Sequence, residues 1–158
     1  MISSRRRHRR AAAAGAALSL VIVAAIAAAG FAAFAAARSA TLRAATVRLS
    51  GPSGRRTARI AVTAGGQSVY WLSGESARHL KCTSAACMAI WPPVRVHGRP
   101  TGIGLSARLG TVRRGRFTQV TLGGHPVYTF APDGGRRGIA TGDGIRSFGG
   151  VWHVFGAR

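Results

Sequence analysis

Two patterns of apolar residues divide the chain. An uncharged run extends over 27 positions, residues 11–37, and no polar face interrupts it. About 20 apolar residues are enough to cross the hydrocarbon of a bilayer as a helix. From about residue 58 onward, short apolar or β-branched stretches alternate with Gly-Gly pairs instead. The first pattern predicts a transmembrane helix, and the second predicts a small, mainly β domain.

The predicted membrane helix is rich in alanine, so its larger side chains supply the driving force for insertion. At about −0.3 to −0.6 kcal/mol each, eight such side chains contribute roughly −2 to −5 kcal/mol. Five arginines lie in the basic tail, residues 1–10, whereas Arg38, Arg43 and Arg48 follow the run. Because basic residues favour the cytoplasmic side, we expect a single-pass plasma membrane protein with its N-terminus inside and its C-terminal domain outside.

A cleaved signal peptide is the alternative interpretation of the same run. Signal peptides end in small residues, and Ala35-Ala36-Ala37 could serve as the cleavage site. In that case the protein would be secreted. The run is longer than the apolar core of about 7 to 15 residues that signal peptides contain, which favours a retained anchor.

The rest of the chain is predicted to form a linker and then a repeated β domain. Residues 38–57 contain Gly, Pro, Ser and Arg without a sustained apolar period, which indicates a linker, with one early strand at 45–49. One short helix is expected at residues 85–90, next to the cysteines. The expected strands cover residues 59–63, 68–72, 117–122, 126–130 and 150–155.

An internal repeat organises residues 58–158. Residues 62–70 (VTAGGQSVY) match residues 120–128 (VTLGGHPVY) at a constant offset of 58, with six of nine positions identical. A Gly-Gly pair between two β stretches is typical of a hairpin, because the favoured turns need positive φ. Trp91 and Trp152 end the two units, about 58–97 and 116–155, and we expect both to pack in the core. We therefore predict two β-hairpin units that share one hydrophobic face.

The composition indicates a strongly basic protein. The sequence has 23 Lys+Arg residues against three acids, and its formal net charge is +20. Such a surface attracts polyanions, so anionic envelope polymers or lipid head groups are the expected partners, besides the membrane through the chain's own helix. Charge alone gives no sequence specificity, and no specific nucleic acid is expected.

Little in the sequence points to catalysis. The histidines are scattered, and the sequence contains no HExxH, GxSxG, Walker or GxGxxG-after-strand pattern. We therefore expect a non-enzymatic binding or structural module without a cofactor. An enzyme that acts on wall material through Glu75 and Asp133 is a weaker alternative, and turn capping is the simpler role for these two acids.

The two cysteines permit two interpretations. Cys82 and Cys87 are separated by four residues, which is typical of a short-loop disulfide in an oxidising exterior. Alternatively, they could bind copper together with His79 and Met88, because thiolate, thioether and imidazole ligands suit that metal. This alternative would make the protein a redox or metal-handling protein outside the cytoplasm.

Three short motifs together resemble one family. Tyr128, Phe130 and Asp133 fit the pattern Yx(FWY)xxD, and the closing GGVW of residues 149–152 fits as well. The cysteine pair with the Trp-Pro-Pro of residues 91–93 completes the set. The chain is similar in these motifs to the bacterial secreted-repeat proteins, the lipoproteins with the Yx(FWY)xxD motif. The resemblance covers roughly residues 60–155 and implies an exported, twice-repeated domain whose biochemical role is not established.

The chain also departs from this family pattern. At the positions that correspond to the motif, the first unit has Tyr70, Leu72 and Glu75, so its copy is degenerate. Four residues separate the cysteines, where three is the spacing associated with the family. No cysteine lies at the end of the apolar run, so a lipid anchor is not available there, and an uncleaved helix is the more plausible anchor.

Overall fold

The computed structural model describes residues 40–158. The predicted basic tail at 1–10, the predicted membrane helix or signal segment at 11–37 and the first two residues of the predicted linker lie outside the described residues. Within residues 40–158, no helix has the length and apolar character that crossing a membrane would require.

The described chain is mainly β, with one short α-helix beside the cysteines, as predicted. The elements are β1 (Leu42–Leu49), β2 (Arg56–Thr63), β3 (Tyr70–Leu72), α2 (Ala85–Ile90), β4 (Gly102–Ile103), β5 (Leu109–Arg114), β6 (Phe117–Leu122), β7 (His125–Pro126), the 3-10 helix η1 (Ala131–Asp133), β8 (Ile139–Ala140), β9 (Arg146–Ser147) and β10 (Gly150–Val154).

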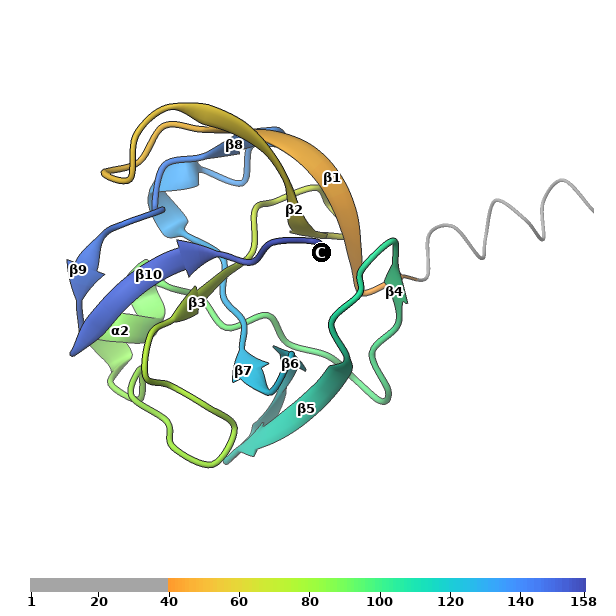
Figure 1. Ribbon diagram of the computed structural model, residues 1–158. Helices are drawn as coiled ribbons and strands as arrows, with labels where there is room; N and C mark the ends of the chain where they lie inside the picture. Colours follow the sequence, from red (N-terminus) through yellow and green to blue (C-terminus); the bar gives the residue numbers. More distant parts are fainter. Residues whose placement is uncertain (1–39) are drawn as a thin grey trace, which may run out of the picture. The chain divides into compact units, whose positions relative to one another are not determined.

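The strands form three small sheets. One sheet has the order β2-β1-β4, and β8 also pairs with β1. The other two sheets have the orders β3-β10-β9 and β5-β6-β7. Figure 1 shows the β1–β2 pair at one end of the domain and the β5–β6–β7 sheet at the other, with β3 and β10 between them.

Each repeat unit opens with an antiparallel hairpin that begins one strand earlier than predicted. β1 pairs with β2 along its whole length, and β5 pairs with β6 in the same way. β1 therefore occupies the middle of the predicted linker, and the expected strand at 45–49 is its second half. Leu42, Val47 and Leu49 of β1 are buried, but Ala, Thr and Arg separate them, so no sustained apolar period marks this strand. Hereafter unit 1 is residues 42–97 and unit 2 is residues 109–158.

Most of the other predicted elements are present. β6 and α2 have the predicted bounds, β10 ends one residue before the predicted strand, and residues 59–63 lie within β2. The two strands after the Gly-Gly pairs differ. β3 covers only the last part of 68–72, and β7 covers only the start of 126–130. The reason is that the chain leaves its own hairpin there and bonds to the other unit.

The two Gly-Gly turns have different lengths. In unit 2, Gly123 and Gly124 both have positive φ, at 59° and 84°, and join a hairpin in which Leu122 faces His125. Two central residues with positive φ match the twist of the flanking strands. In unit 1, Val62 pairs with Ser68, and the N–H of Thr63 donates to the carbonyl oxygen of Gln67 at 2.9 Å, so the loop covers three residues, 64–66. Both predicted hairpins are thus present, and the loop of the first is one residue longer than the loop of the second.

The two units exchange their C-terminal segments. β10 of unit 2 pairs with β3 of unit 1, and Val154 lies opposite Tyr70. The equivalent segment of unit 1 pairs with unit 2 in the same way, and Pro93 lies opposite Tyr128. At the centre, Tyr70 and Tyr128 exchange backbone hydrogen bonds of 2.8 and 2.9 Å. The repeat is therefore a pair of crossed units related by an approximate twofold axis.

The core lies along this axis. Trp91 and Trp152, the equivalent residues of the two units, stack with ring centroids 3.9 Å apart and an angle of 6° between their planes. Both side chains have no exposed surface, so the predicted core role of the two tryptophans is what the structure shows. Their contact joins the units through the largest apolar side chains available.

Candidate functional site

The motif residues of the two units meet in crossed pairs. Tyr70 of unit 1 donates a hydrogen bond to Asp133 Oδ2 of unit 2, at 2.7 Å. Tyr128 of unit 2 donates to Glu75 Oε1 of unit 1, at 3.0 Å. Each acid therefore binds the tyrosine of the other unit, and Glu75 occupies the position in unit 1 that Asp133 occupies in unit 2.

Each carboxylate also holds the loop that follows it within its own unit. Glu75 Oε1 accepts the backbone N–H groups of Lys81 at 2.9 Å and Cys82 at 3.1 Å. Asp133 Oδ1 accepts the backbone N–H of Thr141 at 3.0 Å and its hydroxyl at 2.6 Å. We expected turn capping by both acids, and both do accept backbone amides. The amides lie six to eight residues farther along the chain, so the acids fix whole loops rather than their own turns.

Burial keeps the two tyrosines of this cluster neutral. Tyr70 and Tyr128 have no exposed surface, and Glu75 and Asp133 are 1% and 4% exposed. Burial raises the pKa of Tyr70 far above its usual value, and the hydrogen bond to Asp133 raises it further. The pKa of Tyr128 is raised by burial and then by the charge of Glu75, while Arg114 opposes this. Both tyrosines are therefore neutral donors, and neither carboxylate faces solvent.

Two equivalent arginines add further crossed contacts. Arg56 of unit 1 forms an ion pair with the buried Asp143 of unit 2, with Nη2 and Oδ2 3.0 Å apart. Its counterpart in unit 2, Arg114, donates to the hydroxyl of Tyr128 at 2.9 Å and to the backbone carbonyl of Cys82 in unit 1. Each hairpin is thus tied to the loop of the other unit.

The third position of the motif packs against the tryptophans. Phe130 stacks on Trp91, with centroids 4.2 Å apart and an interplanar angle of 26°. Leu72, which takes the equivalent position in unit 1, is buried and lies opposite Trp152 in the β3–β10 pair. The aromatic residue of the motif therefore serves packing, and an aliphatic side chain fills the same role in the degenerate copy.

The cysteines form the predicted disulfide. Cys82 and Cys87 are bonded and almost fully buried, and they join the loop after Glu75 to α2. Because both sulfur atoms are bonded to each other, no thiolate is available for the copper site considered with His79 and Met88. Among the described residues, no group of three or more His, Cys, Asp or Glu side chains could hold a metal ion.

Tyr128, Phe130 and Asp133 lie within a segment of the chain that matches a known protein family. Residues 115–155 match a secreted repeat of unknown function. The resemblance predicted from the motif is confirmed over this part of unit 2. No curated protein and no solved structure matches the chain. The secreted repeat and the disulfide, which is typical of oxidising compartments, agree on a location outside the cytoplasm.

The start of the secreted repeat contributes to a basic depression on the surface, here called the arginine hollow. It has a volume of about 390 Å³. The guanidinium group of Arg95 lies over the ring of Phe117, 4.2 Å from its centroid. The lining residues are Arg95, Val96, His97, Gly98, Arg113, Arg116, Phe117 and Thr118.

A second depression, the tryptophan hollow, lies where unit 1 meets the end of the secreted repeat. It has a volume of about 410 Å³ and is lined by Arg56, Trp71, His125, Asp143, His153, Val154, Phe155, Gly156 and Arg158. Sequence reasoning missed Trp71, His125 and His153 as a group. They come from three distant segments, and nothing local in the sequence marks their meeting.

Proposed function

We propose that the protein is a non-enzymatic binding module for anionic polymers of the cell envelope. The observation that carries this proposal is the burial of the three acidic side chains. Glu75, Asp133 and Asp143 are all buried, at 4% exposure or less, and each accepts hydrogen bonds within the domain. They are the only acidic side chains in the sequence. The ionised side chains that reach solvent are therefore basic, and a polyanion meets no carboxylate side chain that repels it.

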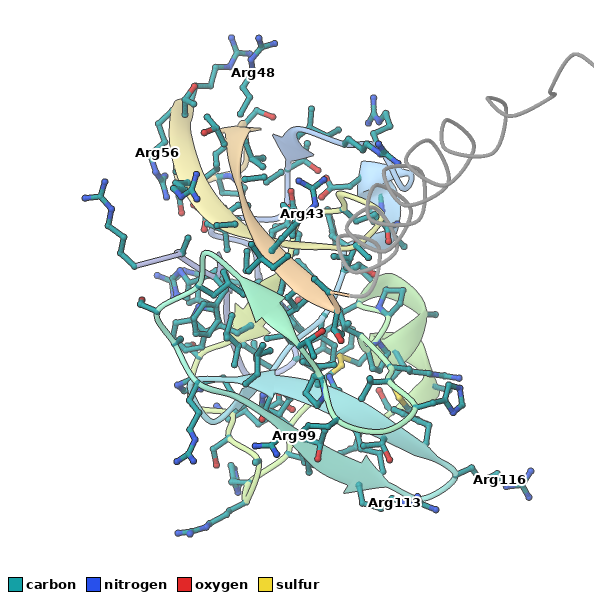
Figure 2. All side chains as sticks on the ribbon, turned by 90° about the vertical axis from the view of Figure 1, so that its right-hand side faces the viewer. Arg43, Arg48, Arg56, Arg99, Arg113 and Arg116 are labelled. Atoms are coloured by element: carbon teal, nitrogen blue, oxygen red, sulfur yellow. A yellow bond between two sulfur atoms is a disulfide. The ribbon has the colours of Figure 1, made fainter. Side chains whose placement is uncertain are left out.

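The arginine hollow is the best candidate for the main contact. Arg95, Arg113 and Arg116 are exposed, and each guanidinium can donate to two oxygen atoms of a phosphate or carboxylate at once. Figure 2 shows Arg113 and Arg116 at one end of the domain and Arg48 and Arg56 at the other. A long polymer could therefore contact both ends, with the hollow as one binding position.

The proposal includes an anchor and a topology. The uncharged run at 11–37 would cross the plasma membrane once, with the five arginines of the tail inside and the domain outside. Fixing the domain next to the membrane would hold envelope polymers close to the cell. Cleavage after the run would instead release the same binding module.

Binding of the full-length protein to purified poly(glycerol phosphate) tests this function. The protein is kept in a neutral polyoxyethylene detergent, and neutral dextran serves as the control polymer. We expect binding to the phosphate polymer alone, falling steeply between about 50 and 500 mM salt, because each phosphate contact releases counterions. Equal binding to dextran, or salt-independent binding, would contradict the proposal.

Two triple variants locate the contact. R95Q/R113Q/R116Q removes three charges from the arginine hollow, and R55Q/R78Q/R137Q removes three exposed charges elsewhere. The slope of log affinity against log salt should fall by about 2 in the first variant, at about 0.7 per lost phosphate contact. The second variant should change it by less than about 1. Identical slopes would show that charge acts without a defined site.

A further inference from the structure

The tryptophan hollow has an equivalent in the other half of the molecule. A third depression, the threonine hollow, has a volume of about 440 Å³ and is lined by Thr41, Thr63, Ala64, Gly65, Gln67, Pro93, Val94, Arg95 and Thr129. Thr129 lies 58 residues after Trp71, and Gln67 lies 58 residues before His125. The approximate twofold axis therefore relates the two depressions, and it relates Trp71 to Thr129.

The two equivalent hollows differ in the chemistry of their walls. In the tryptophan hollow, the ring centroid of Trp71 lies 4.6 Å from that of His125, 5.3 Å from that of His153 and 6.4 Å from that of Phe155. All four rings are half-buried. No aromatic side chain lines the threonine hollow. Since the same backbone forms a hollow without rings, the ring cluster is not needed to complete the fold.

His125 presents a defined hydrogen-bond acceptor. Its Nδ1 lies 2.8 Å from the backbone carbonyl oxygen of Glu75. A carbonyl oxygen can only accept, so Nδ1 carries a proton and, in the neutral ring, Nε2 is the acceptor. A ligand hydroxyl group can donate to this nitrogen.

Two guanidinium groups at the tryptophan hollow can donate hydrogen bonds to an anion. Arg56 and Arg158 belong to its lining. Asp143 also lies there, but both of its oxygens are occupied, Oδ2 by Arg56 at 3.0 Å and Oδ1 by the backbone N–H of Val154 at 3.0 Å. The side chain of Arg56 remains 48% exposed, so guanidinium donors are left for a ligand.

We propose that the tryptophan hollow binds one sugar unit that carries a carboxylate or phosphate group. The rings would contact the apolar face of the sugar, His125 Nε2 would accept from a hydroxyl group, and the arginines would bind the acidic group. A volume of about 410 Å³ lies in the range of small-ligand sites. This inference rests on the proposed function for the origin of the ligand, as one unit of an anionic envelope polymer.

The tryptophans provide a direct measurement. The sequence has three, and Trp91 and Trp152 have no exposed surface, so a ligand in solution reaches Trp71 alone. The full-length protein, in a polyoxyethylene detergent without sugar groups, is titrated with glucuronic acid, glucose 1-phosphate and glucose while tryptophan fluorescence is recorded. We expect both acidic sugars to change the fluorescence, with at least tenfold weaker binding of glucose, as loss of an ionic hydrogen-bonded contact predicts.

Saturation-transfer NMR on the sugar protons gives a second readout that does not depend on the fluorescence of Trp71. W71T places in this hollow the residue that the equivalent hollow contains, and T129A is the control. Binding of the acidic sugars should weaken at least tenfold in W71T and stay within about twofold in T129A. Equal binding by wild type and W71T, or equal binding of glucose and glucuronic acid, would overturn the proposal.

The polymer experiment separates this inference from the proposed function. If poly(glycerol phosphate) binds and neither acidic sugar does, the tryptophan hollow is not a sugar site, while polyanion binding stands. If the acidic sugars bind at Trp71 and the polymer does not bind, the site stands and the proposed source of its ligand is wrong.

Discussion

Unit 1 and unit 2 have a Tyr, an acid and a Trp at equivalent positions, but the loop between the acid and the Trp differs. In unit 1 that loop contains the disulfide and α2, whereas in unit 2 it is rich in glycine and contains β8 and β9. The Tyr, acid and Trp that both copies have make the contacts that cross from one unit to the other. The disulfide, by contrast, bonds within the loop of unit 1.

The same comparison holds for the two equivalent hollows. Both are open and of similar size, but only the tryptophan hollow has rings in its wall. The duplicated interior thus keeps both copies alike, while the surface is free to diverge.

The largest expected effect concerns alkaline pH. Because the folded state raises the pKa of Tyr70 and Tyr128, the unfolded chain releases their protons first, above about pH 10. Below that pH the two tyrosines add no pH dependence to the stability, and above it the stability should fall by about 1.4 kcal/mol per pH unit for each tyrosine. From pH 10 to 12 the loss is about 5 kcal/mol in total. Urea unfolding across this range measures it, and Y70F should halve the slope. A flat profile would contradict the buried, neutral pair.

The next effect concerns the stacked tryptophans. W152A removes a ring that contacts Trp91 at 3.9 Å, and we expect a loss of about 3–5 kcal/mol in the free energy of unfolding. W71A is the matched control, because Trp71 is half-buried, and it should lose about 1 kcal/mol. Chemical denaturation measures both. Equal losses would show that the axis is not the centre of the core.

The third prediction concerns the disulfide, which distinguishes the loop of unit 1 from the loop of unit 2. C82A/C87A opens a short covalent loop that only unit 1 contains, and the expected loss is about 2 kcal/mol. Reduction of the wild-type protein should lower its stability by a similar amount, which separates the covalent bond from the packing of the sulfur atoms. A variant as stable as wild type would show that the loop of unit 1 is held in place without its covalent bond.

The smallest effect compares the two tyrosines. Among the described residues, Tyr70 is the donor to Asp133 Oδ2, whereas Glu75 Oε1 keeps two backbone N–H donors without Tyr128. Y70F therefore leaves a buried carboxylate oxygen unpaired and should be less stable than Y128F by about 1 kcal/mol. Urea titrations of both variants at pH 7 measure the difference. If Y128F is instead the less stable variant, the hydrogen bond from Arg114 to Tyr128 contributes more to stability than the hydrogen bond from Tyr70 to Asp133.

Much of the fold could be predicted from the sequence because the repeat is visible there. The offset of 58 identified Tyr70 with Tyr128 and Glu75 with Asp133, and the Gly-Gly pairs indicated both hairpins. The short spacing of the cysteines predicted their bond. Only the second half of β1 was predicted, as a strand within the expected linker, because its inward residues are irregularly spaced.

The crossing of the units could not be predicted. Two hairpins with a common apolar face can close within each unit or between units, and the pattern of residues is the same in both cases. The tryptophan hollow was missed for a related reason. Trp71, His125 and His153 meet only because β10 pairs with β3, which is a consequence of the exchange.

The exchange between units is the central claim, and separating the units tests it most directly. Fragments 40–98 and 99–158 are produced separately, and their unfolding is followed by circular dichroism and tryptophan fluorescence. Because each unit lacks its partner strand, its partner tyrosine and the second stacked tryptophan, neither fragment should show a cooperative transition, and an equimolar mixture should regain one. Cooperative unfolding of either fragment alone would contradict the account.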